Sequence, residues 1–164
     1  MIHRKVYGKG IASPLQSWDV YAMHRQQFSR EYLKKKDYHY LSGLKKHYNW
    51  NTNLENILSE DYDALVLTDE SVRIQWVNRG FFAMTGYKVK DVLGQTPRLL
   101  QGANTTLESR RAVKENLYSG YSFSTTLVNY RKSEEQYTCR VSIYPLYSRD
   151  ENLSHFIALE SEGI

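Results

Sequence analysis

The chain has 164 residues, enough for one compact domain with an appendage, and its 41% hydrophobic and 24% charged residues are ordinary for a globular protein. It contains no apolar run long enough to cross a bilayer and no secretory signal at its basic start, so we expect a cytoplasmic protein. The one cysteine, Cys139, excludes an internal disulfide and a cysteine-rich metal site, and we interpret it as a small buried hydrophobe.

The net charge of +4 is unevenly distributed along the chain. Residues 1–50 contain ten Lys and Arg against three Asp and Glu, whereas residues 51–164 contain twelve against fifteen. A basic segment with six tyrosines could contact nucleic acid or an anionic membrane. We favour a solvated helical extension whose positive face lies near the acidic remainder of the same or a second chain, and we expect no nucleic-acid partner.

The first 59 residues differ from the rest in composition and in the spacing of their apolar residues. Residues 1–16 are rich in Gly, Lys and Ser, which predicts a mobile basic N-terminus. In residues 17–59, aromatic and apolar side chains recur at helical spacing, which predicts a helical extension of two or three helices, weakened in the middle by Gly43. We interpret its aromatic residues as packing residues rather than as a platform for bases.

From residue 60 onward the pattern predicts an α+β domain. The expected strands lie at 64–68, 72–77, 122–130, 135–147 and 153–161. The expected helical segments lie at 81–84, 89–93, 97–101 and 106–119. Five strands with helices between them indicate a five-stranded antiparallel sheet, short helices on one face, and a pocket between helices and sheet.

Two helix starts are marked by their residue types. Asn78 ends the first hairpin and can cap the helix that follows it. Thr96 is a good N-cap, and Pro97 suits the first helical position because its missing N–H costs nothing there. A helix is therefore expected to run from Pro97 to Gln101, ended by Gly102.

Several motifs resemble those of PAS domains, and of the LOV photoreceptor domains among them. The stretch WVNRGFFAMTGY at 76–87 resembles the PAS pattern N-x-A-F-x-x-L-T-G-Y, and DVLG at 91–94 continues it in register. The segment GQTPRLLQG at 94–102 resembles the LOV signature GxNCRFLQG, and NYRK at 129–132 matches a LOV strand. Residues 60–164 are therefore identified as a LOV-like PAS domain. A helical segment before such a domain often mediates dimerisation, so the resemblance also implies a homodimer through the N-terminal helices.

In LOV domains a flavin mononucleotide (FMN) lies between the sheet and the helices, and blue light makes a cysteine sulfur bond to its ring. The resemblance puts Pro97 at the position of that cysteine and Thr96 at the asparagine before it. Proline carries no nucleophile, so no flavin–thiol adduct can form there. Cys139 does not replace the missing thiol, because it falls on a different strand, where the family has an asparagine that holds the ring.

The resemblance further implies a set of cofactor-binding positions. They fall on Asn78, Arg98, Gln101, Lys114, Asn129, Cys139 and Glu160. Arg98 matches the arginine that binds the phosphate, and Lys114 stands where a second phosphate-contacting arginine is usual. Cys139 replaces an amide that bonds to the ring, and Glu160 replaces the glutamine that relays the light signal. Each of these two changes removes a hydrogen-bond donor worth about 1–3 kcal/mol, so we expect FMN binding to be weakened or lost.

The same residues also have ordinary structural interpretations. Arg98 could form a surface salt bridge or cap a helix, and Gln101 and Asn129 could join a helix to the sheet. Strand alternation places Glu160 on the face of Phe156, which suggests an interior position where it could bind a polar or cationic ligand, or titrate. A fraying C-terminal strand would instead leave Glu160 in solvent.

No catalytic constellation is evident. The sequence contains no phosphate-binding P-loop, and its five histidines have no metal-ligand spacing. We therefore expect a non-catalytic sensory domain for signal transduction that binds a small ligand or a signalling protein. The alternative is a flavin-binding, photoreceptor-like protein that works by photoreduction without an adduct. The initial methionine and the short tail suggest a protein that stands alone.

Overall fold

The computed structural model describes residues 14–163, and it describes side-chain exposure from residue 20 onward. The predicted mobile N-terminus therefore lies outside the described residues, except for residues 14–16. The chain divides into two units, residues 1–37 and residues 38–164. The second unit holds the sheet, the short helices and the end of the first helix.

Helix α1 (Pro14–Tyr48) is one continuous helix, and the short helix α2 (Leu54–Leu58) follows it. Residues 14–16, predicted as part of the mobile N-terminus, are thus helical, with proline at the favoured first position. Gly43 does not interrupt α1. A glycine inside a helix costs about 1 kcal/mol of helix stability. Burial of the neighbouring side chains offsets this cost, because Leu41 is fully buried in the core and Leu44 packs against the same core.

The sheet has five antiparallel strands, as the alternation patterns predicted. Its strands are β1 (Ala64–Asp69), β2 (Ile74–Val77), β3 (Phe123–Tyr130), β4 (Gln136–Tyr147) and β5 (Leu153–Glu162). Their order across the sheet is β2-β1-β5-β4-β3, so the last strand of the chain lies at the centre. In this register Glu160 of β5 pairs with Ala64 on one side and Val141 on the other.

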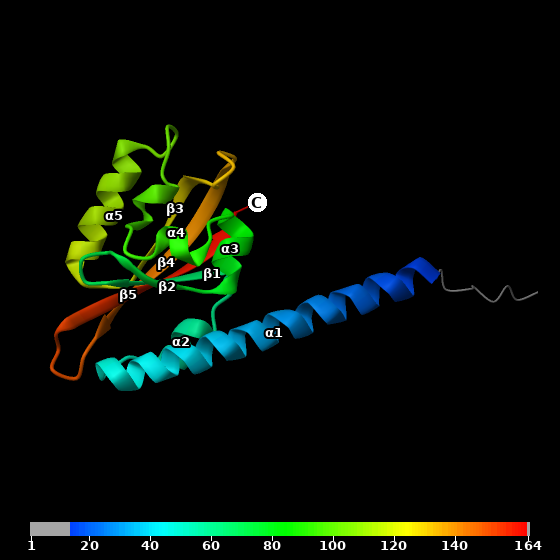
Figure 1. The fold of residues 1–164 in the computed structure, drawn as a ribbon, viewed down its shortest axis with the longest axis horizontal. Helices are drawn as coiled ribbons and strands as arrows, with labels where there is room; N and C mark the ends of the chain where they lie inside the picture. Colours follow the sequence, from blue (N-terminus) through cyan, green and yellow to red (C-terminus); the bar gives the residue numbers. More distant parts are fainter. Residues whose placement is uncertain (1–13, 164) are drawn as a thin grey trace, which may run out of the picture. The chain divides into compact units, whose positions relative to one another are not determined.

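The segment between β2 and β3 forms four helical elements. These are α3 (Arg79–Thr85), α4 (Val89–Val92), the 3₁₀ helix η1 (Pro97–Leu100) and α5 (Leu107–Ser119). Figure 1 shows α3, α4 and α5 gathered on one side of the sheet, with α2 on the opposite side. The segment at Pro97 was expected to be helical, and its four residues between Thr96 and Gln101 form the tighter 3₁₀ form that is usual for such short pieces.

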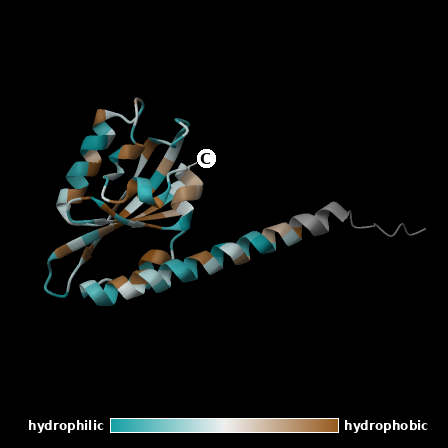
Figure 2. Cartoon of the chain, viewed as in Figure 1, coloured by the Kyte–Doolittle hydropathy of each residue, from teal (hydrophilic) through white to brown (hydrophobic). Residues whose placement is uncertain are grey.

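Two separate cores follow from strand alternation. Side chains at odd positions of β1 and β5, such as Leu65, Leu67 and Leu159, belong to a cluster with Leu41 and Trp50 on the outer face. Side chains at even positions, such as Ala64 and Val66, belong to a second cluster under α3, α4 and η1. Figure 2 shows hydrophobic residues concentrated in the strands, whereas α5 carries many hydrophilic ones. The end of the helical extension thus covers the outer face of the sheet and leaves the inner face to the short helices.

A cavity between the sheet and helix α5

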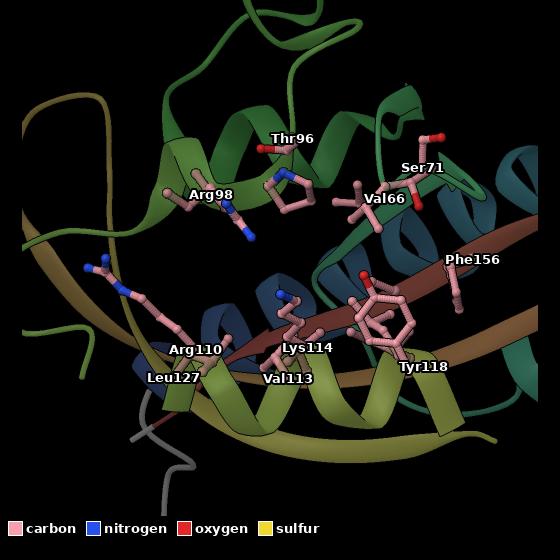
Figure 3. Close-up of a pocket in the computed structure, with 18 of the residues that line it drawn as sticks. Val66, Ser71, Thr96, Arg98, Arg110, Val113, Lys114, Tyr118, Leu127 and Phe156 are labelled. Carbon is pink, nitrogen blue, oxygen red and sulfur yellow. The ribbon is translucent and has the colours of Figure 1, made fainter. Parts of the chain in front are cut away.

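A cavity of about 1130 Å³ lies between the inner face of the sheet and the elements η1 and α5 (Figure 3). All strands except β2 contribute to its walls, together with the turn after β1. Much of the sheet side is apolar. Its apolar side chains include Val66, Leu127, Ile143, Phe156 and Ala158. A cavity of this size with an apolar floor and polar groups on its other walls is typical of a small-molecule site.

Basic side chains line the helical side of the cavity. Arg98 comes from η1, and Arg110, Arg111 and Lys114 come from α5. Arg98 and Lys114 extend toward one another from opposite sides of the space in Figure 3. Arg110 Nη2 donates to the carbonyl of Gly102 at 2.8 Å, which ties the start of α5 to the loop before it. The helical side therefore carries a concentration of positive charge that suits an anion.

Of the acidic side chains that line the cavity, Glu160 is buried, whereas Glu70 and Glu115 are exposed. Glu160 lies near the end of the central strand, is 4% exposed, and its side chain lines the cavity. Burial raises the pKa of Glu160 to about 7, and its Oε2 atom has no hydrogen-bond partner. Near neutral pH this carboxyl group therefore exists in both protonation states, so it can either accept or donate a hydrogen bond. Its interior position agrees with the alternation argument from the sequence.

Unsatisfied polar atoms concentrate around this cavity. Among the described residues, four buried side-chain atoms lack a hydrogen-bond partner: Thr68 Oγ1, Arg110 Nε, Tyr137 Oη and Glu160 Oε2. Three of the four belong to residues that line the cavity. The great majority of buried polar groups in proteins are hydrogen-bonded, so three unsatisfied atoms on residues around one cavity are unusual. A polar molecule in the cavity would supply the missing partners.

Five of the seven sequence-predicted site residues line the cavity. These are Arg98, Gln101, Lys114, Asn129 and Glu160. The structure thus brings together residues from η1, α5, β3 and β5 that are distant in the sequence. Pro97, at the position implied for the reactive cysteine, also lines it.

The remaining two predicted site residues, Asn78 and Cys139, are not among the lining residues. Asn78 Oδ1 accepts hydrogen bonds from the amides of Leu65 at 2.9 Å and Phe81 at 3.0 Å, so it caps α3 and fastens it to β1. Cys139 is fully buried in the inner core. Burial and the charge of Glu160 raise the pKa of the Cys139 thiol, so it stays neutral and unreactive.

A family model for the PAS domain matches residues 63–160. The chain belongs to the PAS domain family. The match covers the sheet and all the helices that pack on its inner face, which are the elements that build the cavity. It leaves the helical extension outside.

The relatives of this PAS domain include light-sensing proteins. Phototropin-1A of Oryza sativa subsp. japonica is 32% identical over 89 residues, which are 54% of this chain and 10% of the phototropin. A blue-light-activated histidine kinase of Brucella abortus is 32% identical over 85 residues, which are 52% of this chain and 17% of the kinase. The chain therefore matches less than a fifth of the length of either relative.

Solved structures show the same likeness. The dark structure of the blue-light photoreceptor Aureochrome1 LOV superposes with a TM-score of 0.65 at 25% identity, covering 70% of this chain and 85% of that chain. Its light-state structure gives a TM-score of 0.62 at 25% identity, covering 68% and 90%. The chain is thus a LOV-like PAS domain, similar to sensory domains of light-sensing proteins.

The sequence prediction missed two lining residues of the PAS domain cavity that carry an unsatisfied buried atom. Thr68 was noted only as the end of a strand, although it shares the inner face of β1 with Ala64 and Val66 by alternation. Arg110 lies one helical turn before Lys114, the residue that was predicted, and both line the cavity. Alternation and helical spacing could have found both residues.

Neither a metal site nor a membrane-spanning helix is evident among the described residues. Within residues 14–163, no group of three His, Cys, Asp or Glu side chains could hold a metal ion. In the same part of the chain, no helix has the length and apolar character needed to cross a membrane.

Proposed function

We propose that this PAS domain is a non-catalytic sensory module that binds a small polar ligand in the cavity, and that it works without cysteinyl-flavin photochemistry. The observation that carries the proposal is the cavity itself, with three unsatisfied buried polar atoms on Thr68, Arg110 and Glu160. A ligand that bonds to these atoms would recover the free energy lost by burying them, about 1–3 kcal/mol for each.

The residues around the cavity argue against a thiol adduct. Pro97 lines the cavity at the position implied for the reactive cysteine, and it has no nucleophilic atom. Cys139 lies in the inner core with a raised pKa, which keeps it in the unreactive thiol form.

The side chains of the cavity suit the phosphate end of FMN and do not suit its ring end. Arg98 and Lys114 face the cavity from two elements and would suit a phosphate. Glu160, when ionised, would repel a ring carbonyl, and Cys139 offers only a weak donor in place of an amide. The basic pair keeps a second candidate function open, a flavin protein that works by photoreduction without an adduct.

The sheet would transmit ligand binding from the cavity to helix α1. The strands β1 and β5 present their even positions to the cavity and their odd positions to the cluster that holds Leu41 of α1. A ligand that shifts these strands would bias how α1 packs, which is a two-state change that binding can select. Exposed apolar residues on α1, including Met23 at 68% and Phe28 at 74%, support homodimerisation or partner binding through this helix. Light scattering across a dilution series, with F28E as the variant, tests the dimer.

One experiment separates the two candidate functions. The full chain is purified from cells without added cofactor, its visible absorbance is recorded before and after blue light, and co-purifying small molecules are identified by native mass spectrometry. We expect a colourless protein that carries a small molecule other than flavin. A yellow protein with no adduct would favour the second candidate. A flavin that bleaches in blue light and recovers in the dark would refute the absence of adduct chemistry.

A variant extends this test. P97C supplies the missing thiol, yet we expect it to remain without a photocycle, because Cys139 and Glu160 still disfavour the flavin ring. The triple variant P97C/C139N/E160Q, incubated with FMN, should bind it more tightly than P97C does. A photocycle in P97C alone would show that the ring end of the cavity already accepts flavin.

A further inference from the structure

We infer that the cavity selects a ligand with two unlike ends: a cationic nitrogen group that donates to Glu160, and an anionic group that meets the basic side chains of η1 and α5. The inference rests on the proposed function, because it assumes that the cavity binds a ligand. It assigns a chemical class to that ligand, a zwitterion with an apolar body.

The position of Glu160 defines the acidic end. Its backbone is held in the middle of the sheet, since its carbonyl accepts from the amide of Asp63 at 2.8 Å and its neighbours across the strands are Ala64 and Val141. Its Oε2 atom is buried without a partner. On the adjacent strand, Tyr137 and Cys139 can carry no positive charge, and burial raises the pKa of each, so both stay neutral. Arg131, which lies over the Tyr137 ring, forms its ion pairs with Glu135 and Glu162 instead. The acidic end therefore lacks a counter-ion from the sheet.

The helices do not provide that counter-ion either. The charged side chains that line the cavity are Glu70, Arg98, Arg110, Arg111, Lys114, Glu115 and Glu160. Burial is the cause of the raised pKa of Glu160, and none of the four cations offsets it. Within the part of the chain that the structure describes, no ion pair joins Glu160 to any of these four cations, and its Oε2 atom has no hydrogen-bond partner. A cation placed at Glu160 would satisfy a buried charge that this protein leaves uncompensated.

The floor of the cavity is apolar. Val66, Ala158 and Leu127 line it. A ligand that fills the space over this floor therefore needs an apolar body that carries its two charged groups.

The charge of Glu160 makes this class distinguishable from ligands that end in a carbonyl. A carbonyl would need the protonated carboxyl group as a donor, so its binding would weaken as pH rises through about 7. An ammonium group needs the ionised carboxylate, so its binding would strengthen over the same range. The direction of the pH dependence thus reports which group meets Glu160.

The test uses isothermal titration of the full chain with four probes. They are 8-aminooctanoate, its one-ended analogues octanoate and octylamine, and FMN. At about pH 8 we expect 8-aminooctanoate to bind about tenfold or more tightly than octanoate, as for a charge-assisted hydrogen bond. We expect that advantage to shrink at about pH 6 and to disappear in E160Q. E108Q, which neutralises an exposed carboxylate of α5 outside the cavity, is the matched control and should keep the advantage.

Each outcome decides the inference. Equal binding of octanoate and 8-aminooctanoate, or an advantage lost in E108Q rather than in E160Q, would overturn the assigned class while leaving ligand binding intact. Tighter binding of FMN than of any other probe would overturn it in favour of the flavin candidate. No binding of any probe, with no co-purifying molecule, would overturn both the inference and the proposed function. If E160Q does not fold, the pH dependence of probe binding to the unmodified chain still decides between the two directions.

Discussion

Replacing Glu160 by glutamine should stabilise the ligand-free protein above neutral pH. Burial raises the pKa of this carboxyl from 4.5 to about 7. The folded state therefore favours the protonated form, whose stabilising contribution is complete below pH 4.5 and is lost as pH rises through about 7. The shift corresponds to about 3 kcal/mol of unfolding free energy, a large share of the stability of a domain of this size.

Urea denaturation across pH 5–8, followed by tryptophan fluorescence, measures this effect. Trp50 is 2% exposed in the outer core and should report unfolding well. We expect the midpoint of the unmodified chain to fall as pH rises, the midpoint of E160Q to change much less, and E160Q to be the more stable protein at pH 8. E115Q removes an exposed carboxylate and should follow the unmodified chain. An E160Q protein with the same pH slope as the unmodified chain would refute the argument that Glu160 carries the buried charge.

Three further predictions concern the fold. A methyl group at Gly80 would lie 1.8 Å from the backbone oxygen of Asp63, so G80A should lower the unfolding free energy by about 3 kcal/mol or more. Gly43 lies in mid-helix with open space around it, so G43A should raise the unfolding free energy by about 1 kcal/mol. Chemical denaturation of the two variants and of the unmodified chain measures both changes. Burial lowers the pKa of His155 below its usual 6.5, so the contribution of His155 to stability should decrease as pH falls below that value. Thermal melts of the unmodified chain and of H155Q at several pH values should therefore show the stability of the unmodified chain relative to H155Q decreasing below pH 6.5. N78A leaves two buried amides without their acceptor and should cost about 2 kcal/mol or more, and a change under about 0.5 kcal/mol would contradict the anchoring role.

Local patterns were sufficient to predict most of the elements. The five strands begin and end within two residues of their predicted positions, because alternating burial along a strand is visible in the sequence itself. Residue types at the helix ends were equally informative. Thr106 caps α5 through the amide of Ser109, and Gly120 ends it in the left-handed conformation at φ 74°.

The helical extension shows what such patterns leave open. Two or three helices were predicted in residues 17–59, and the structure has two, one of them unbroken across Gly43. Intrinsic helix propensity penalises glycine, but packing of Leu41 into the core outweighs that penalty. The covering of the outer sheet face by α2 and the end of α1 was not predicted, because helical periodicity shows that a face is apolar without showing what it packs against.

The amino-acid sequence alone indicated most of the secondary structure and the PAS resemblance, and it favoured an inward direction for Glu160, because each depends on residue types and spacing within a short segment. Only the tertiary structure decided that Asn78 and Cys139 belong to the framework and that Glu160 has no counter-ion. Those properties depend on which side chains from β1, β4, β5, η1 and α5 come together, and on the exclusion of water between them. Burial and hydrogen-bond satisfaction are properties of the packed chain, so they arise only when distant segments meet.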